Sequence, residues 1–157
     1  MHPSAQKVAD AARVLGLDIE IVEFAQTTRS AQEAADAIGC DVAQIVKSLC
    51  FVVNGRATIC LVSGANQLDE RKLATLAGFG RKKVQRADAE TVKAATGFSI
   101  GGVPPFGHAS RLPIYIDEDL LQFDVVWAAA GTPFAVFAIQ PETLVKASGG
   151  IQAELKQ

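Results

Sequence analysis

The sequence predicts an α+β fold in which a mixed, largely antiparallel sheet is surrounded by helices. The dipeptide Asn54-Gly55 stands between two runs of β-branched and aromatic residues, a pattern typical of a tight β-hairpin. Other apolar runs are separated by segments with helical spacing. Because some strands are joined by hairpins and others by helices, the sheet cannot be purely parallel. The 157 residues suffice for one compact domain, which we place at residues 1–157.

Most of the expected helices begin at a residue whose side chain can accept a hydrogen bond from the first-turn amides, and stop at a glycine. They run from Ser4 to Gly16, from Ser30 to Gly39, from Asp69 to Gly78 and from Asp88 to Gly97, and a last one carries Pro141 in its first turn. Ser30 with Glu33 forms a capping box. Asp41 with Gln44 repeats it directly afterwards, which predicts a second, short helical start.

The expected strands are short runs rich in β-branched and aromatic residues, bounded by turn residues. In chain order they are residues 19–24, the run that starts near Lys47, and residues 57–62, 83–85, 114–116, 125–128 and 134–139. The tripeptide Gly131-Thr132-Pro133 is the expected turn between the last two strands.

The composition excludes a disordered chain and a membrane protein of the helical class. Hydrophobic residues make up 49% and charged residues 20% of the sequence, and the mean hydropathy is +0.21. No apolar run approaches the roughly 18 residues that a membrane span needs. The N-terminus also lacks the basic-then-apolar order of a signal peptide, so we expect a cytoplasmic protein.

Neither a metal site nor a cofactor is indicated. Cys40, Cys50 and Cys60 are odd in number and have no CxxC or Cys/His spacing, so we expect reduced thiols that bind no metal. His2 lies in the terminus, and His108 has no serine or cysteine nucleophile motif to serve, so a catalytic triad is not indicated. Motifs for nucleotide phosphates, zinc proteases and dinucleotides are absent as well.

One segment is strongly basic although the whole chain has a net charge of −2. Residues 71–93 hold seven basic side chains against two acidic ones. The basic residues are Arg71, Lys72, Arg81, Lys82, Lys83, Arg86 and Lys93. Such a patch can bind phosphates while the rest of the surface repels them. A solvated face without a binding role is an equally open interpretation.

A glycine-rich loop is the most unusual local feature. Residues 96–108, TGFSIGGVPPFGH, contain four glycines and two prolines. Glycines let a ligand approach the main chain closely, and prolines restrict the alternative conformations of the loop. The fixed amides and carbonyls could hold a water molecule or a developing oxyanion without a dedicated acid–base side chain. A tight helix-to-strand connection explains the same residues without any ligand.

Lys47 is the second anomaly, because its neighbours Ile45, Val46 and the run SLCFVV belong in a core. A solvated lysine at a helix-to-strand junction is one interpretation. The other is an ammonium at the mouth of a pocket, where a reduced dielectric strengthens its attraction to phosphate or to developing negative charge.

With these two features the chain resembles the YbaK-like aminoacyl-tRNA deacylases, a family related to the editing domain inserted in bacterial prolyl-tRNA synthetases. The likeness covers roughly residues 4–148. Its pieces are TTRSAQEAADAIG, QIVKSLCFVVNG, QLDERKLA, RKKVQRADAETVKAATGFSIGGVPPFGH, LPIYIDEDLL and AAGTPFAVFAIQPETL. The order of the lysine, then QLD, then the glycine-rich loop makes the resemblance specific.

The resemblance implies a partly barrel-like sheet with a pocket between the lysine-bearing strand and the glycine-rich loop. It also implies hydrolysis, in trans, of the ester that joins a wrong amino acid to the terminal adenosine of tRNA. The catalytic residues it implies are Lys47, Gly101, Gly102 and Pro105, the last three from the family's GxxxP loop. No metal or other cofactor is implied for this reaction.

The residues expected around that pocket also have simpler explanations. The substrate-binding candidates are Phe24, Ser63, Asn66, Phe106 and His108, and the tRNA-binding candidates are Arg71, Lys72, Arg81, Lys82, Lys83 and Arg86. Core packing explains the two phenylalanines equally well, turn chemistry explains the serine and the asparagine, and a hydrogen bond within the loop explains the histidine. The expected proton-transfer group is the ribose hydroxyl of the substrate, because the sequence offers no convincing general base.

Small amino acids on tRNA-Pro or a related tRNA are the expected substrates. Where some relatives carry polar side chains, this chain has the apolar run Trp127-Ala128-Ala129-Ala130 and Ala135, and Pro104 replaces a small polar residue. The expected partners are mischarged tRNA and, as an open alternative, an aminoacyl-tRNA synthetase. The competing functions are a non-catalytic module that binds tRNA, a nucleotide or an amino acid, and a synthetase subunit. A monomer and a homodimer both stay open.

Overall fold

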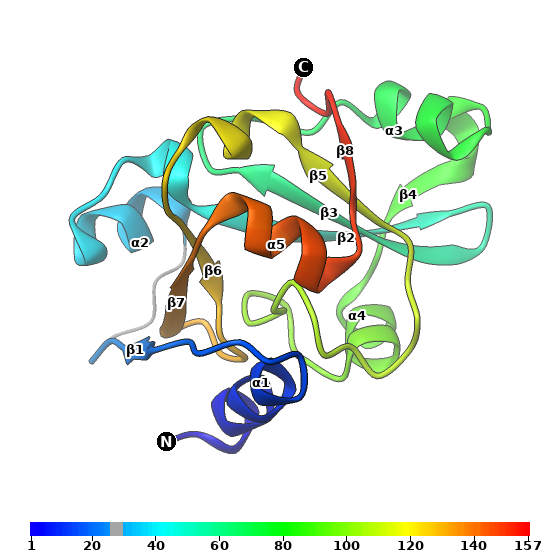
Figure 1. Ribbon diagram of the computed structural model, residues 1–157. Helices are drawn as coiled ribbons and strands as arrows, with labels where there is room; N and C mark the ends of the chain where they lie inside the picture. The colour runs from blue at the N-terminus through cyan, green and yellow to red at the C-terminus, as the bar shows by residue number, and fades with distance from the viewer. Residues whose placement is uncertain (26–29) are drawn as a thin grey trace.

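The computed structural model describes residues 1–25 and 30–157, and in it two sheets lie at the centre with helices around them (Figure 1). Residues 27–29, which begin the TTRSAQEAADAIG piece, therefore lie outside the described residues. The strands are β1 (Ile21–Glu23), β2 (Val46–Val53), β3 (Arg56–Ser63), β4 (Val84–Arg86), β5 (Ile114–Asp117), β6 (Val126–Ala129), β7 (Ala135–Ile139) and β8 (Ile151–Ala153).

The larger sheet has the strand order β4-β2-β3-β5-β8, and the smaller sheet has the order β1-β7-β6. β2 pairs antiparallel with β3 and β4, and β7 pairs antiparallel with β1 and β6. β5 pairs parallel with both β3 and β8. The predicted α+β class with a mixed, largely antiparallel sheet is thus confirmed. An isolated bridge from Ile45 to Trp127 links the two sheets, which do not close into a barrel within the described part of the chain.

The helices surround the sheets and mostly begin and end where the sequence predicts. They are α1 (Pro3–Val14), α2 (Ala31–Ile38), α3 (Glu70–Ala77), α4 (Ala89–Thr96) and α5 (Pro141–Ser148), with short 3₁₀ helices η1 (Val42–Gln44), η2 (Arg81–Lys83) and η3 (Glu118–Gln122). Ser30, Asp69 and Asp88 accept hydrogen bonds from first-turn amides, as expected of N-caps. The Asp41–Gln44 capping box is complete.

Three local predictions differ from the structure. α1 is capped by His2 and not by Ser4: Pro3 occupies the first helical position and has no N–H, so the cap bond runs from Ser4 N to His2 Nδ1 at 3.0 Å. β1 is shorter than residues 19–24, because its register with β7 spans only Ile21–Glu23. β8 was not expected, since three residues beside a parallel edge leave no periodic signal in the sequence.

β3 is buried on both faces and divides the core. Ile59 and Leu61 belong to the main cluster, between the two sheets and α1, whereas Cys60 and Val62 belong to a second cluster beneath α3. Because successive side chains of a strand point to opposite faces, this alternation assigns a face to each residue of the neighbouring strands. On β2, Val46 and Cys50 face the main cluster, and Phe51 and Val53 face the second one.

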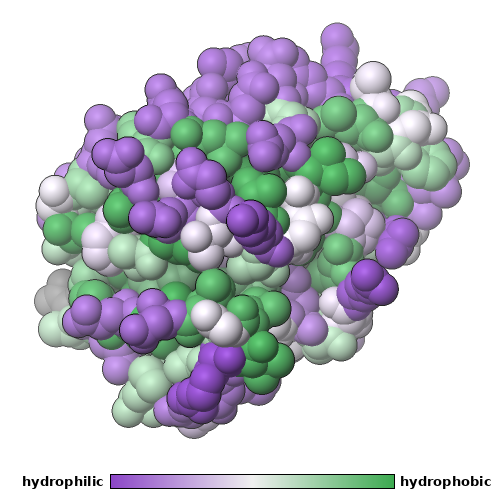
Figure 2. All heavy atoms as spheres, viewed as in Figure 1, coloured by the Kyte–Doolittle hydropathy of each residue, from purple (hydrophilic) through white to green (hydrophobic). Residues whose placement is uncertain are grey.

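None of the helices in the described ranges is long and apolar enough to cross a bilayer. Hydrophilic residues are spread over the face of the molecule in Figure 2, and hydrophobic residues show between them.

Candidate functional site

A cavity of about 640 Å³ lies at the edge of β2 that β3 does not cover. β4 pairs with β2 only from Phe51 to Val53, so the first half of β2 has a free edge between β4 and β6. The cavity is lined from β2 by Val46, Lys47, Ser48, Leu49 and Cys50. A volume of this size lies within the range of ordinary small-molecule sites.

The other walls come from six separate parts of the chain. They are the start of α2, the η1 segment with Val42 and Ile45, Gly64 after β3, the β4–α4 junction, the glycine-rich loop, and the turn between β6 and β7 with its flanking residues. The side chains that line the cavity from these parts include Arg86, Val92, Ile100, Val103, Trp127, Ala129, Thr132, Ala135 and Val136. The cavity therefore lies between the lysine-bearing strand and the glycine-rich loop.

The cavity has a cationic part and an apolar part, and the strand alternation explains why. Lys47 lies on the same face of β2 as Phe51, and the Arg86 guanidinium lies 5.8 Å from the centre of the Phe51 ring. Ser48 lies on the opposite face with Cys50, which packs in the main core. The two cations thus share one side of the free edge, while Val136 and Trp127 supply apolar walls from the smaller sheet.

Main-chain groups of Ser48 are also directed to this edge. The Cys50 carbonyl accepts a hydrogen bond from Ala87 N at 3.0 Å, so Cys50 directs its main-chain groups away from β3. In an antiparallel ladder, residues two apart direct their N–H and C=O groups to the same side. Ser48 therefore presents a donor and an acceptor at the cavity, opposite to the side where β3 pairs.

Lys47 is half-buried, and its ammonium donates a hydrogen bond to the Asn66 carbonyl. Burial lowers the pKa of Lys47, the charge of Arg86 lowers it further, and the charge of Asp117 opposes both effects. The ammonium is thus held at the cavity with only partial compensation for its lost hydration. That state favours binding of an additional negative group.

The glycine-rich loop contributes Gly101 to the cavity but not Gly102 or Pro105. Gly101 has φ +90°, a backbone conformation that residues with a side chain rarely adopt, and it lies against Pro133. Gly102 is buried, and a Cβ there would lie 2.5 Å from the Gly131 carbonyl oxygen. Its N–H donates to Ser99 O and its carbonyl accepts from Gly131 N. Gly102 therefore permits close packing of the loop on the β6–β7 turn, rather than contact with a ligand.

The substrate-binding candidates from the sequence are not among the described residues that line the cavity, although Gly64 beside Ser63 lines it and the Asn66 carbonyl contacts Lys47. Phe106 packs against Phe137 in the main core, with ring centres 5.6 Å apart. The Ser63 hydroxyl donates to Ala43 O at 2.7 Å, and the Asn66 side chain donates to carboxylates of the β5–η3 segment. Phe24 donates its main-chain N–H to Phe134 O at 2.7 Å.

His108 also serves the loop rather than the cavity surface. Its Nε2 lies 2.7 Å from the Pro104 carbonyl, and burial lowers its pKa although this hydrogen bond opposes the shift. A neutral imidazole that donates from Nε2 fits both observations.

The structure places the tRNA-binding candidates in three different environments. Arg81 pairs with Glu70, and Lys72 pairs with Glu154 at 3.4 Å. Arg71, Lys82 and Lys83 are exposed. Arg86 alone of the six lines the cavity, a placement that its position in a basic run does not reveal.

Sequence reasoning missed two cavity-lining hydroxyls. The side-chain oxygens of Ser48 and Thr132 are buried and have no hydrogen-bond partner among the described residues. Thr132 is only 4% exposed. Unpaired buried hydroxyls are uncommon and costly, and only the structure can identify them.

Comparison with known proteins places these features in a family. The family model described as "Aminoacyl-tRNA editing domain" matches residues 25–147. The chain is 32% identical over 126 residues to "Uncharacterized protein YwhH" of Bacillus subtilis (strain 168), covering 80% of this chain and 78% of that protein. It is 29% identical over 127 residues to "Putative Cys-tRNA(Pro)/Cys-tRNA(Cys) deacylase EbsC" of Enterococcus faecalis, with coverages of 80% and 76%.

A solved structure shows the same similarity to editing proteins. The chain superposes with a TM-score of 0.94 and 46% identity on "Crystal structure of a putative trans-editing enzyme for prolyl tRNA synthetase", covering 100% of this chain and 99% of that one. A shorter likeness, 26% identical over 99 residues, is to "Proline--tRNA ligase" of Thermoanaerobacter sp. (strain X514), of which it covers 17%.

Proposed function

Because the chain belongs to the aminoacyl-tRNA editing domain family, we propose that it is an aminoacyl-tRNA deacylase that acts in trans as a single editing domain over residues 1–157. The reaction adds water to the ester between an amino acid and the terminal ribose of tRNA. Its products are the free amino acid and the uncharged tRNA. Translation fidelity gains because a mischarged tRNA is cleared after a synthetase has released it.

The observation that carries this proposal is that Lys47, Arg86 and Gly101 line one cavity. A tRNA 3′ end brings anionic phosphate, a ribose and an aminoacyl group to the same place. The two cations suit the phosphate and ribose, and the apolar interior suits the side chain of a small amino acid. A cavity of about 640 Å³ has room for an aminoacyl-adenosine rather than for an amino acid alone.

In the proposed mechanism, positioning supplies most of the rate enhancement. Lys47 and Arg86 hold the terminal phosphate or ribose, so that the ester lies between Gly101 and the main chain of Ser48. Main-chain dipoles there stabilise the negative charge that develops on the ester carbonyl when water attacks. The neighbouring ribose hydroxyl accepts a proton from the attacking water and passes its own proton to the leaving ribose oxygen. The substrate supplies this group because the cavity lining includes no carboxylate or imidazole among the described residues.

Small amino acids on tRNA-Pro or a related tRNA are the proposed substrates. The relatives named as a Cys-tRNA(Pro) deacylase, a trans-editing enzyme and proline–tRNA ligases support this direction. Trp127, Ala129, Ala135 and Val136 make the interior walls apolar and fixed. Because one methylene changes binding by only about 1–3 kcal/mol, a stiff wall must exclude the larger cognate prolyl group by shape.

The test is a deacylation panel with alanyl-, cysteinyl-, seryl- and prolyl-tRNA, in the absence of added metal and nucleotide. We expect rapid hydrolysis of at least one of the small aminoacyl groups, slow hydrolysis of prolyl-tRNA, and loss of turnover in Lys47→Ala. Binding of tRNA with no turnover on any substrate would favour the non-catalytic module. Full activity of a folded Lys47→Ala protein would remove Lys47 from the mechanism.

A further inference from the structure

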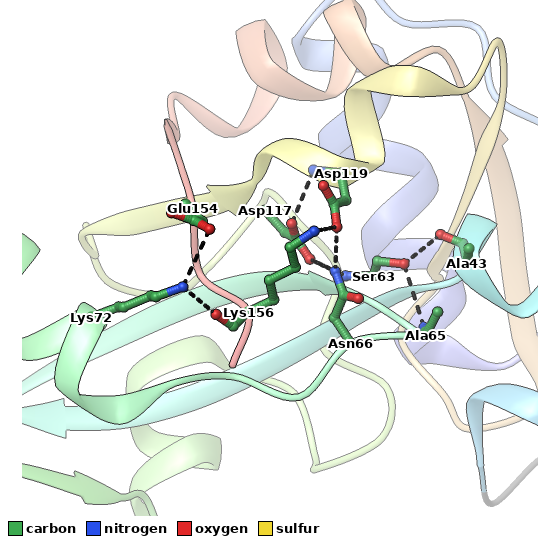
Figure 3. Close-up of polar contacts among 9 residues, drawn as sticks. All are labelled: Ala43, Ser63, Ala65, Asn66, Lys72, Asp117, Asp119, Glu154 and Lys156. Carbon is green, nitrogen blue, oxygen red and sulfur yellow. Dashed lines mark hydrogen bonds and ion pairs between the residues drawn. The ribbon is translucent and has the colours of Figure 1, made fainter.

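A carboxylate with no exposed surface organises the turn that follows β3 (Figure 3). Asp117 Oδ2 accepts hydrogen bonds from Ser63 N at 3.0 Å and from Asn66 Nδ2 at 2.8 Å. Asp117 Oδ1 accepts from Asp119 N at 3.0 Å. The Asn66 amide reaches Asp119 Oδ2 as well, at 2.9 Å. The side chain of Asn66 is therefore held by two carboxylates.

The main chain of the same residue holds the ammonium of the site. The Asn66 carbonyl accepts the hydrogen bond of Lys47 Nζ. Fixing the Asn66 side chain fixes the orientation of this carbonyl, because the two groups belong to one residue in a tight turn, where Asn66 N also donates to Ser63 O at 2.9 Å. A continuous path of hydrogen bonds thus runs from Asp117 through Asn66 to Lys47.

The strand register brings the two charges to the same face. Lys47 pairs with Val62 on β3. Leu61 pairs with Ile116 on β5, so one residue further Val62 stands beside Asp117. Lys47, Val62 and Asp117 consequently form a row across three adjacent strands. Neighbouring strands lie about 4.8 Å apart, which places the Cα atoms of the two charged residues about 10 Å from one another.

The charge of Asp117 has no ion-pair partner among the described residues, although burying a carboxylate is costly. Three N–H donors stabilise it. Its charge opposes the lowering of the Lys47 pKa by burial, and it adds to the raising of the Lys156 pKa, of which the hydrogen bond to Asp119 is the main cause. Lys156 is already paired with Asp119 at 3.0 Å. Of the two cations at the cavity, Lys47 is the one that hydrogen bonds through Asn66 connect to this buried charge.

We propose that Asp117 is a positioning residue: through the side chain of Asn66 it fixes the carbonyl that holds the Lys47 ammonium at the cavity. This inference rests on the proposed function for its catalytic consequence. Asp117 itself does not line the cavity, so it acts through Lys47 and does not contact the substrate. The substrate-binding role expected for Asn66 is replaced by a role in orientation.

Two variants separate the charge of Asp117 from the geometry that it fixes. In Asp117→Asn, an oxygen at the position of Oδ2 keeps the bonds from Ser63 and Asn66, whereas the negative charge and the acceptor for Asp119 N are lost. In Asn66→Ala, both carboxylates remain and the clamp on the carbonyl is lost. Glu118→Gln is the matched control, because Glu118 is the exposed neighbour of Asp117 and loses the same charge outside the network.

The first measurement is an NMR titration of the Lys47 side chain in the unliganded protein. The charged groups acting on Lys47 are Arg86 on β4 and Asp117 on β5. We expect the Lys47 titration to move to lower pH in Asp117→Asn and to stay in place in Glu118→Gln. An unchanged titration in a folded Asp117→Asn protein would overturn the proposal, as would an equal shift in the control.

The second measurement is the steady-state kinetics of deacylation, with the uncatalysed ester hydrolysis subtracted. We expect Asn66→Ala to lower kcat about tenfold to 100-fold with little change in KM, the loss typical of a misplaced reacting group. A merely structural role would lower stability but leave kcat of the folded protein within about twofold, and this result would refute the proposal. If Asp117→Asn does not fold, Asn66→Ala decides by its kcat.

The two proposals fail in different ways. If the wild-type protein hydrolyses none of the aminoacyl-tRNAs, the proposed function fails, and the Lys47 titration in the unliganded variants still tests the positioning. If the wild-type protein is active and Lys47→Ala is inactive while the Lys47 titration ignores Asp117, only the positioning fails.

Discussion

The Lys47 ammonium, near the start of β2, donates its hydrogen bond to the main-chain carbonyl of Asn66 beyond the end of β3. A carbonyl is a neutral acceptor, so this bond orients the ammonium and leaves its charge available. Burial and the neighbouring Arg86 disfavour that charge and lower the pKa of Lys47. A phosphate or a developing oxyanion in the cavity would therefore gain more from Lys47 than from a lysine in open solvent.

Replacing Lys47 should separate activity from stability. In Lys47→Met, the apolar part of the side chain is kept, and the ammonium, whose lost hydration is only partly compensated, is removed. We expect deacylation to fall at least 100-fold, while the free energy of unfolding at neutral pH is unchanged or higher by up to about 1–2 kcal/mol. Single-turnover kinetics and urea unfolding measure the two effects. Lys146→Met on α5, an exposed lysine, is the control and should retain activity.

Gly102 should tolerate no side chain. A Cβ at Gly102 would lie 2.5 Å from Gly131 O, and two main-chain segments would have to separate. We expect Gly102→Ala to lower the free energy of unfolding by about 1–3 kcal/mol, and to lower kcat because Gly101 moves with the loop. Gly80→Ala is the matched control, since nothing lies within 4 Å of a Cβ there and its φ of −77° suits alanine. Equal stability of the two variants would contradict this account of the loop.

The sequence predicted much of the fold because its local signals agree with one another. N-caps such as Asp69 and Asp88, the glycines after the helices and the Asn54-Gly55 turn each act over a few residues, and the structure retains them. β8 escaped prediction because it depends on a parallel neighbour that is distant in sequence. The register that places Asp117 in a row with Lys47 is equally non-local.

The candidate site was predicted in its centre but not in its boundary. Lys47 stands out as a charged residue in an apolar run, and Gly101 lies in an unusual glycine- and proline-rich loop; the structure brings both to one cavity. Ser63 and His108 are polar residues near the same motifs in sequence, yet their polar atoms are used within the fold. Proximity along the chain cannot distinguish a group that is free to bind from one that is already paired.

Replacing Thr132 should show whether its hydroxyl takes part in substrate selection. Its oxygen is buried without a partner among the described residues, and valine has the same shape without the hydroxyl. We expect Thr132→Val to raise the free energy of unfolding by about 1 kcal/mol and to change the ratio of alanyl- to seryl-tRNA hydrolysis. The same panel measures both substrates. An unchanged ratio together with higher stability would assign the hydroxyl no part in selection.

His108 should make stability depend on pH on the acidic side of neutrality. Its pKa in the folded protein is below the ordinary value, so the unfolded chain binds a proton first as pH falls. Stability is therefore complete above the ordinary histidine pKa of about 6.5 and is lost as pH falls toward the folded pKa, by at most about 1.4 kcal/mol per pH unit. Urea midpoints of the wild type and His108→Gln at several pH values measure this difference. A constant difference between them from about pH 5 to about pH 7.5 would contradict it.

The basic segment should contribute affinity for tRNA rather than chemistry. Val53 pairs with Val84, so Lys82 and Lys83 lie beyond the hairpin end of β2, about 20 Å from Lys47 at about 3.3 Å per residue. That distance suits contact with the acceptor stem while the 3′ end occupies the cavity. We expect Lys82→Glu with Lys83→Glu to raise KM several-fold at low salt, to leave kcat unchanged, and to weaken the salt dependence of KM.

Lys146→Glu, which changes a charge on α5, should leave KM within about twofold, as expected for a non-specific contribution of one surface charge. An unchanged KM in the double variant at low salt would exclude this footprint, and a fall in kcat would place the two lysines closer to the reaction than the strand register allows.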